Sequence, residues 1–409
     1  MIYNNQEVFN YAWENLTNFA KKGLCTYVLR LFKIIQFVLY SCIPKKGRFY
    51  LSKIETGELV FHLNSWYQSI MKGEIKKAIG LKSEVDQLMP CADPDEQVIL
   101  YCQLIESRHR ILLESTENNS DSFMRSAGDS EVNGMLSFYY YLFNGVHEAF
   151  KSNNFKAIEL FKIAEKKLGF VQDEIEIAEF HYRMGTTYYH MQSTFLSENH
   201  LEKAVEIYNK YGDYSRRQIT CNIALGLNYI DQFRYDLAQE TLLNCSEMSR
   251  SLGDDILFSI SVFNLGYLHI KKEELKEAVK FIEKSLQSAD LRENAPFAYL
   301  HGVYEAVRCY FKLGDSKSAL KWLQLGFTLA SERDHGIFLL KFNTLHSLYV
   351  LGDNGKVREC VKRLEQNKAY VDVEAIALDI AEFYKQRKDF KTSIYFYDVL
   401  INAKKHILK

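Results

Sequence analysis

Three segments ahead of residue 115 carry apolar residues at the spacing of an amphipathic helix. They are ELVFHLNSWYQSIMKG (58–73), EIKKAIGLKSEVDQLM (74–89) and DEQVILYCQLIESRHRILLE (95–114). Pro90 and Pro94 separate the second segment from the third, and Asp95 follows at once, where an acidic residue favours a helix start. The pattern predicts a small bundle of three antiparallel helices.

Beyond about residue 138, small residues return at fixed offsets, which indicates an internal repeat. Gly145 is followed by Ala157, Phe161 and Ala164. Copies of this scheme begin at Gly185, Gly226, Gly266, Val307 and Ala381. Two antiparallel helices cross closely only where neither carries a bulky side chain. The pattern therefore predicts tetratricopeptide repeats that start near 138, 178, 219, 259, 299, 338 and 374, about 40 residues apart where 34 is usual.

We expect an all-α fold in which the three-helix bundle is followed by a right-handed superhelix of about seven tetratricopeptide repeats. The predicted parts are an apolar N-terminal extension (1–52), the bundle (53–114), a linker (115–135) and the repeat domain (136–407). The linker is predicted because TENNSDSFMRSAGDSEVN (115–132) is polar and rich in Ser, Asn and Gly. The inner surface of such a superhelix suits an extended peptide.

The N-terminal extension contains an apolar stretch, LCTYVLRLFKIIQFVLYSCI (24–43), which admits three interpretations. A membrane span is the first, although Arg30 and Lys33 would each cost about 2.5–3.5 kcal/mol at a bilayer centre. An amphipathic helix lying on a surface is the second. The third is that residues 1–50 are upstream sequence read in frame. KKGR (45–48) can be encoded by a string that resembles a bacterial ribosome-binding site, and a TTG codon for Leu51 can act as a start.

Composition excludes several classes of function. The net charge is −1, so no basic surplus marks a nucleic-acid binder. The eight cysteines form no C-x-x-C pair, which disfavours a zinc ribbon and fits reduced thiols in a cytoplasmic protein. Phosphate-binding glycine loops, H-E-x-x-H and G-x-S-x-G are absent from the sequence. His181 and His190 could face one side of a helix, but a core or groove role is favoured over metal. We expect no cofactor and no metal.

The combination of a three-helix bundle, a polar linker and about seven repeats resembles the Rap family of Bacillus quorum-sensing regulators. The strings that carry the resemblance are LNSWYQSI (63–70), LYCQLIESRHRILLE (100–114), FYYYLFNGVHEAF (138–150), KIAEKKLGFVQDEIEIAEFHY (162–182) and YYHMQST (188–194). The resemblance covers about residues 53–405 and leaves out the first fifty.

The resemblance implies a regulator that binds a response regulator protein through the bundle. Some family members dephosphorylate the aspartyl phosphate of a sporulation phosphorelay regulator, and others block DNA binding by a competence regulator. A secreted pentapeptide binds the repeat groove and switches the regulator off, through a compaction in which bundle and linker join the superhelix. The alternatives are a non-catalytic adaptor that sequesters a regulator's DNA-binding domain, and a general repeat scaffold.

The resemblance also implies a catalytic position early in the third bundle helix, where phosphatase members carry a Gln. A neutral amide orients a water for attack on phosphorus without repelling the phosphate. That position is Glu96 here, and Gln97 is its neighbour, which a local shift after Pro94 could bring into place. Without the resemblance, Glu96 would be an ordinary solvated first-turn carboxylate. At the partner interface, a bulky aromatic of the family is Ser107 here and a Tyr is Cys102.

The peptide site implied by the resemblance is better preserved. An Asn that clamps peptide backbone matches Asn264, in FNLG. Asn228 and Asp231, in LNYID, match a further Asn and an Asp of the groove, and Tyr189 aligns with a groove tyrosine. A buried amide both donates and accepts hydrogen bonds, so it matches a peptide unit. The alternatives are that Tyr189 belongs to the core and that Asn228 and Asp231 are turn residues.

Overall fold

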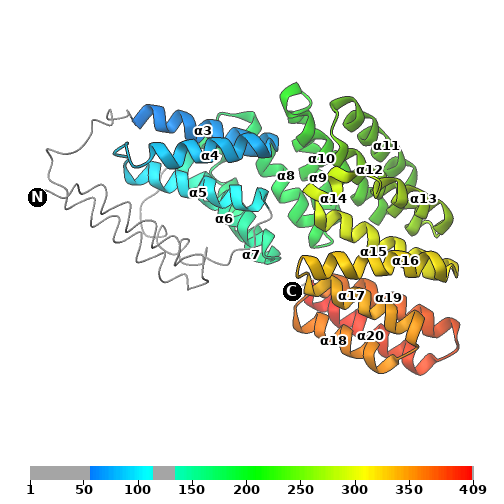
Figure 1. Ribbon diagram of the computed structural model, residues 1–409. Helices are drawn as coiled ribbons and strands as arrows, with labels where there is room; N and C mark the ends of the chain where they lie inside the picture. The colour runs from blue at the N-terminus through cyan, green and yellow to red at the C-terminus, as the bar shows by residue number, and fades with distance from the viewer. Residues whose placement is uncertain (1–55, 114–133, 408–409) are drawn as a thin grey trace, which may run out of the picture. The chain divides into compact units, whose positions relative to one another are not determined.

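The computed structural model describes residues 56–113 and 134–407, and these ranges are all-helical, with 18 α-helices and no strand (Figure 1). The three interpretations of residues 24–43, the start at Leu51 and nearly all of the predicted linker lie outside the described residues. None of the described helices is both long and apolar enough to cross a membrane. The predicted fold class is confirmed.

Three helices precede the repeats: α3 (Thr56–Lys72), α4 (Ile75–Leu88) and α5 (Glu96–Leu112). Helix α5 begins where the sequence predicts, because the Asp95 carboxylate accepts a hydrogen bond of 2.8 Å from the Val98 amide and caps the helix. Trp66 joins α3 to α5: its indole nitrogen donates to Nδ1 of His109 at 3.0 Å, and its ring is 1% exposed.

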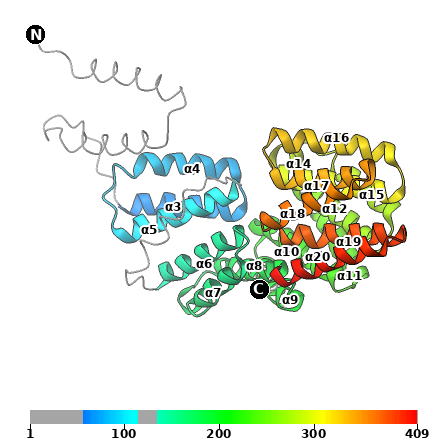
Figure 2. The same cartoon turned by 90° about the horizontal axis from the view of Figure 1, so that it is seen from below.

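Seven antiparallel helix pairs follow and can be traced along the chain in Figures 1 and 2. They are α6 (Met135–Phe150) with α7 (Asn154–Glu165), α8 (Glu174–His190) with α9 (Thr194–Tyr208), α10 (Ser215–Asp231) with α11 (Tyr235–Leu252), α12 (Asp255–Lys271) with α13 (Leu275–Ser285), α15 (Pro296–Leu313) with α16 (Ser316–Glu332), α17 (Gly336–His346) with α18 (Asn354–Gln366), and α19 (Tyr370–Gln386) with α20 (Phe390–Ile407). First helices start about 40 residues apart, and the last step falls to about the usual 34.

Short elements fill the connections between some pairs. A short helix, α14 (Ala289–Asn294), and two 3₁₀ turns, η1 (Leu168–Phe170) and η2 (Gly212–Tyr214), lie between successive pairs. In the sixth pair, whose sequence pattern is the weakest, α17 runs into a π-helical turn, η3 (Ser347–Leu351).

The repeated glycines lie where the two helices of a pair come closest. A Cβ atom built on Gly145 would lie 2.4 Å from the Phe161 ring, and one on Gly226 would lie 2.9 Å from the Leu242 side chain. Gly185 meets Leu201 and Gly266 meets Ile282 in the same way. Each glycine of the first helix therefore receives a large side chain of the second, as the spacing of small residues predicts.

The turn inside each pair contains a left-handed residue that the sequence analysis did not predict. In six of the seven pairs it lies seven positions after the residue that begins the repeat scheme, at Ser152 (φ 62°), Gln192 (φ 57°), Phe233 (φ 61°), Glu273 (φ 61°), Gly314 (φ 76°) and Lys388 (φ 63°); in the sixth pair it is Gly352 (φ 64°). Glycine adopts this conformation without steric penalty, whereas other residues lose about 1–2 kcal/mol. Phe233 is notable because its side chain is also 77% exposed.

We predict that Gly145→Ala lowers the free energy of unfolding by about 1–3 kcal/mol, because the added methyl group collides with the Phe161 ring. Chemical denaturation of the two proteins measures the difference. Gly80→Ala is the matched control, since Gly80 lies in α4 with no atom within 4 Å of the added Cβ. That change should leave stability equal or raise it by up to about 1 kcal/mol. Equal effects at the two positions would contradict the packing argument.

We predict that Phe233→Gly raises the free energy of unfolding by about 0.5–1 kcal/mol, because it relieves the left-handed strain and removes little buried surface. Phe195→Ala removes an equally exposed ring, 78% accessible, from ordinary helix α9. It serves as the control and should not stabilise by the same mechanism. A Phe233→Gly protein that melts below the wild type would show that the aromatic ring itself supports the turn.

Candidate functional site

The candidate catalytic residues Glu96 and Gln97 are the first two residues of α5, and both are exposed. They follow the Asp95 cap directly, so both side chains lie at the open N-terminal end of the helix. Cys102 and Ser107 lie further along α5 and are half-buried. The helix thus offers one polar end to a partner, with a carboxylate and a neutral amide next to each other.

The candidate peptide residues lie on the first helices of three successive repeats. Tyr189 is near the end of α8, and its hydroxyl donates to the carboxylate of Asp231, the last residue of α10. Lys271 of α12 approaches the same carboxylate at 4.0 Å, and its ammonium lies 5.2 Å from the centre of the Tyr267 ring. The structure therefore brings Tyr189 and Asp231 together, and adds Tyr267 and Lys271, which the sequence analysis missed.

The pKa of Asp231 is set by influences that oppose one another. Burial raises the pKa of its carboxyl, while the nearby Lys271 ammonium and the Tyr189 hydroxyl lower it, and the net direction is upward. Burial likewise raises the pKa of Tyr189, with Asp231 as the next cause, so that hydroxyl stays neutral and available as a donor.

The two candidate asparagines are buried on the same helices. Asn228 is 0% exposed within α10, and its amide nitrogen donates to the Ser197 hydroxyl and to the Ala224 carbonyl oxygen, each at 2.9 Å. Its own carbonyl oxygen has no partner among the described residues. Asn264 is 5% exposed on α12. The alternative that Asn228 is a turn residue is wrong, because it lies inside a helix.

The seventh repeat reaches the second one close to this cluster. The Gln192 amide, in the turn after α8, donates to Glu374 of α19 at 2.9 Å. Lys404 of α20 lies 3.5 Å from the other oxygen of Glu374, and the Glu374 charge helps to raise the pKa of Asp231. A carboxylate from a distant part of the sequence therefore contributes to the electrostatics around Tyr189 and Asp231.

A second polar network joins the last repeats, and the sequence analysis missed it. Arg308 of α15 binds Glu305 of its own helix at 2.6 Å and Asp379 of α19 at 2.5 Å, and Lys312 also reaches Asp379, at 2.6 Å. Only the Glu305–Arg308 pair has a signal in the sequence, because residues three apart share a helix face.

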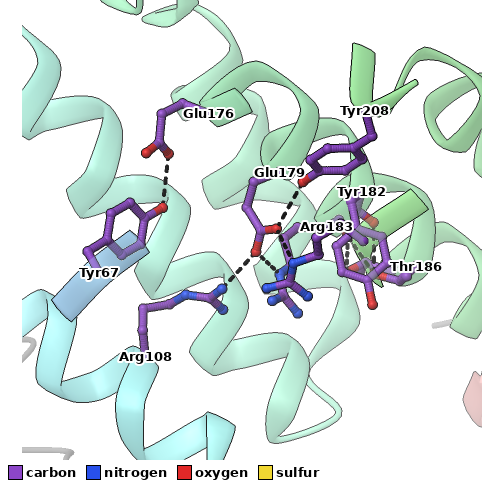
Figure 3. A network of polar contacts seen from close by, with 10 residues as sticks. Tyr67, Arg108, Glu176, Glu179, Tyr182, Arg183, Thr186 and Tyr208 are labelled. Carbon is purple, nitrogen blue, oxygen red and sulfur yellow. Dashed lines mark hydrogen bonds and ion pairs between the residues drawn. The ribbon is translucent and has the colours of Figure 1, made fainter. Parts of the chain in front are cut away.

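A third network links the bundle helices to the first repeats, and Figure 3 shows it from close by. The Tyr67 hydroxyl of α3 donates to Glu176 of α8 at 2.9 Å, and the Arg108 guanidinium of α5 donates to Glu179 of α8 at 2.7 Å. The sequence analysis missed these residues too. A weak signal existed, because Glu176, Glu179 and Arg183 recur at spacings of three and four residues and so share one helix face.

The structure pairs His181 with a histidine other than His190. His181 of α8 pairs with His200 of α9, with their Nδ1 atoms 2.9 Å apart. Burial lowers the pKa of each imidazole to about 4, so both rings are neutral at pH 7. His190 has a different environment and is exposed. Within residues 56–113 and 134–407 there is no group of three or more His, Cys, Asp or Glu side chains that could hold a metal ion.

Comparisons with known proteins agree along the length of the chain. The family model described as "response regulator aspartate phosphatase H, N terminal" matches residues 53–114, and tetratricopeptide repeat models match residues 176–251 and 261–290. The regulatory protein RapD of Bacillus subtilis (strain 168) is 32% identical over 349 residues, which is 85% of this chain and 99% of RapD. Response regulator aspartate phosphatase I of the same organism is 28% identical and covers 85% of this chain and 90% of its own length.

The solved structures agree as well. A crystal structure of a Rap protein complexed with competence and sporulation factor superposes with a TM-score of 0.77 at 30% identity, covering 86% of this chain and 98% of that one. Likeness of sequence and fold thus extends across both the bundle and the repeats. The chain belongs to the Rap family.

Proposed function

We propose that this protein is a peptide-controlled regulator of a bacterial response regulator. The bundle, and above all the N-terminal end of α5, binds the response regulator. The first helices of the repeats bind a short extended peptide that switches this binding off. The protein works in the cytoplasm, without nucleic acid, and a membrane enters only if the N-terminal extension is native.

The observation that carries the proposal is the cluster of Tyr189, Asp231 and Lys271 on three successive first helices. An extended peptide presents an amide unit about every 3.3 Å, so it is recognised by polar groups spaced along a row of helices. Asn228 and Asn264 supply amides on two of the same helices, and the Asn228 carbonyl oxygen has no partner among the described residues. The complex of a related Rap protein with competence and sporulation factor supports a peptide as the ligand.

A second candidate function, sequestration without catalysis, is favoured by one residue. Glu96 stands where phosphatase members carry a Gln, and it is exposed at the start of α5. Its carboxylate would lie near the negative charge of an aspartyl phosphate, and two like charges 4 Å apart repel by about 1 kcal/mol even in water. Relatives include both a protein named as a regulatory protein and one named as a phosphatase. We therefore propose that binding is the main activity and that hydrolysis is weak.

We predict that Asn264→Ala weakens peptide binding about tenfold, because it removes an amide that pairs with the peptide backbone. Calorimetric titration measures the affinity, with the synthetic pentapeptide encoded by the open reading frame directly downstream of the gene. Asn343→Ala is the matched control, since Asn343 is an exposed first-helix asparagine of α17 whose amide bonds to its own helix at Leu339. Unchanged affinity of a folded Asn264→Ala protein would remove Asn264 from the site.

We predict that Glu96→Gln accelerates dephosphorylation of a phosphorylated phosphorelay response regulator by about fivefold or more, because it removes the like-charge repulsion. Loss of radioactive label from the regulator measures the rate, and co-purification measures binding. Gln97→Ala distinguishes catalysis through Gln97 from sequestration without catalysis. If the wild type already removes label rapidly and Gln97→Ala abolishes this, Gln97 is catalytic and the sequestration hypothesis fails.

A further inference from the structure

Two buried glutamates, one helical turn apart on α8, have opposite charge environments. Glu179 is 1% exposed and is surrounded by arginines: Arg108 and Arg183 each at 2.7 Å, and Arg217 at 3.5 Å. Burial alone would raise the pKa of Glu179, but the three guanidinium groups together lower it to about 2. Glu179 is therefore a carboxylate in the folded protein.

Glu176 is also buried, with 6% of its surface exposed, but no positive charge in the described part of the chain offsets the cost of burying its carboxylate. Its carboxyl accepts a hydrogen bond from the Tyr67 hydroxyl and interacts with the Tyr139 hydroxyl, and both donors are neutral. Among the described residues, no Lys, Arg or His side chain forms an ion pair with it. A buried carboxylate without a cation is strongly disfavoured, and such a group takes up a proton instead.

The groups that face Glu176 from each neighbouring element also favour its protonated form. Tyrosine hydroxyls come from α3, α5, α6 and η2, and acidic groups come from its own helix and the cap of that helix. They are Tyr67, Tyr101, Tyr139, Tyr214, Asp173 and Glu179. Arg108 of α5 is bound to Glu179 (Figure 3). Burial, with Glu179 and Asp173 as further causes, raises the pKa of Glu176 to about 8 despite its tyrosine donors.

Glu176 lies at the contact between the bundle and the repeats. Tyr67, which binds it, also packs its ring against Tyr139 and Phe143 of α6, with centroids 5.7 and 5.3 Å apart. Lys72, at the end of the same helix α3, binds Asp213 of η2 at 3.0 Å. The carboxyl of Glu176 is covered because α3 packs against these elements, and it would meet water if α3 moved away.

We propose that the bundle docks on the first two repeats with Glu176 protonated, so that docking takes up one proton and weakens as the pH rises through neutrality. This inference concerns the chain alone and holds whether or not it binds a peptide or a response regulator. The carboxyl becomes a hydrogen-bonding acid among tyrosine hydroxyls when the bundle is docked, and an ordinary carboxylate when it is not.

The direction of the effect follows from proton linkage. Exposed to water, Glu176 has an ordinary pKa near 4.5, whereas in the docked arrangement its pKa is about 8. Between these values the docked arrangement binds more protons than the undocked one, so docking is favoured by acid and weakened by base. The docking equilibrium constant should fall roughly tenfold between pH 6.5 and 8.

The range from pH 6.5 to 8 isolates this group from others. His181 and His200 have pKa values lowered from 6.5 to about 4, so they act with the opposite sign, and their effect fades between pH 6.5 and about 7.5. Burial raises the pKa values of the buried thiols Cys221, Cys245 and Cys309, so they begin to contribute above pH 8. A pH series confined to this window therefore reports mainly on Glu176.

Hydrogen exchange of the full-length chain, followed by mass spectrometry, tests the proposal. Rates are corrected for the intrinsic pH dependence of exchange and read in α3, α5 and α8. In the wild type, protection of these helices should fall roughly tenfold from pH 6.5 to 8. In Glu176→Gln, which mimics the neutral acid, protection should be independent of pH and higher than the wild type at pH 8. A flat wild-type profile, or the same slope in Glu176→Gln, would overturn the proposal.

Two further variants test whether the pH dependence comes from Glu176. Glu174→Gln is the matched control, because Glu174 lies on the same helix but is exposed and binds Tyr211 and Lys210. It should keep the wild-type slope. Tyr67→Phe removes a donor that favours the carboxylate, so it should move the midpoint of the transition to higher pH. If Glu176→Gln does not fold, difference infrared spectroscopy of the wild type decides: a carboxylic-acid carbonyl band must vanish between pH 6.5 and 9, and its absence at pH 6.5 refutes the idea.

Discussion

The close approach of the two helices within each repeat is the constraint on which the rest of the structure depends. In the first four repeats, a glycine on the first helix receives the Phe161, Leu201, Leu242 or Ile282 side chain from the second, and no Cβ fits at these points. Successive first helices also lie near enough for single side chains to bridge them. The Tyr189–Asp231 hydrogen bond and the Lys271–Asp231 approach both span such neighbouring helices.

Helix α8 is one of the places where charged groups are buried. Around Glu179, three guanidinium groups share one carboxylate, and burial lowers the pKa of Arg108 to about 10. A buried ion cluster of this kind contributes little net stability, because desolvation offsets most of the attraction. The cluster instead constrains geometry. The buried Arg108 guanidinium and the Glu179 carboxylate are paired only when α5 packs against α8 in this arrangement. The network therefore specifies where the helix that carries Glu96 and Gln97 comes to lie.

Local features were predictable from the sequence, and contacts between distant helices were not. The glycine offsets and the Asp95 cap were visible because each depends on residues of one helix or one pair. The Tyr67–Glu176 contact joins residues 109 positions apart, and its existence depends on how α3 packs against α8. Tyr189 and Asp231 were identified through family resemblance. Lys271 and Tyr267 were not, because their part in the cluster depends on how α12 packs beside α10. The left-handed turn residues escaped notice because Ser, Gln, Phe, Glu and Lys carry no common signal for that conformation.

The hydrogen bond between Gln192 and Glu374 joins two repeats that are not neighbours in sequence. In an open array, each repeat contacts only its neighbours, and stability is close to a sum of local terms that can be lost one end at a time. Here the second repeat is tied to the seventh across 182 residues of sequence. This contact couples the two repeats: if the C-terminal repeat loosens, Gln192, in the turn after the helix that carries Tyr189, loses a partner. The environment of Tyr189 and Asp231 therefore depends in part on a repeat that lies far away in sequence.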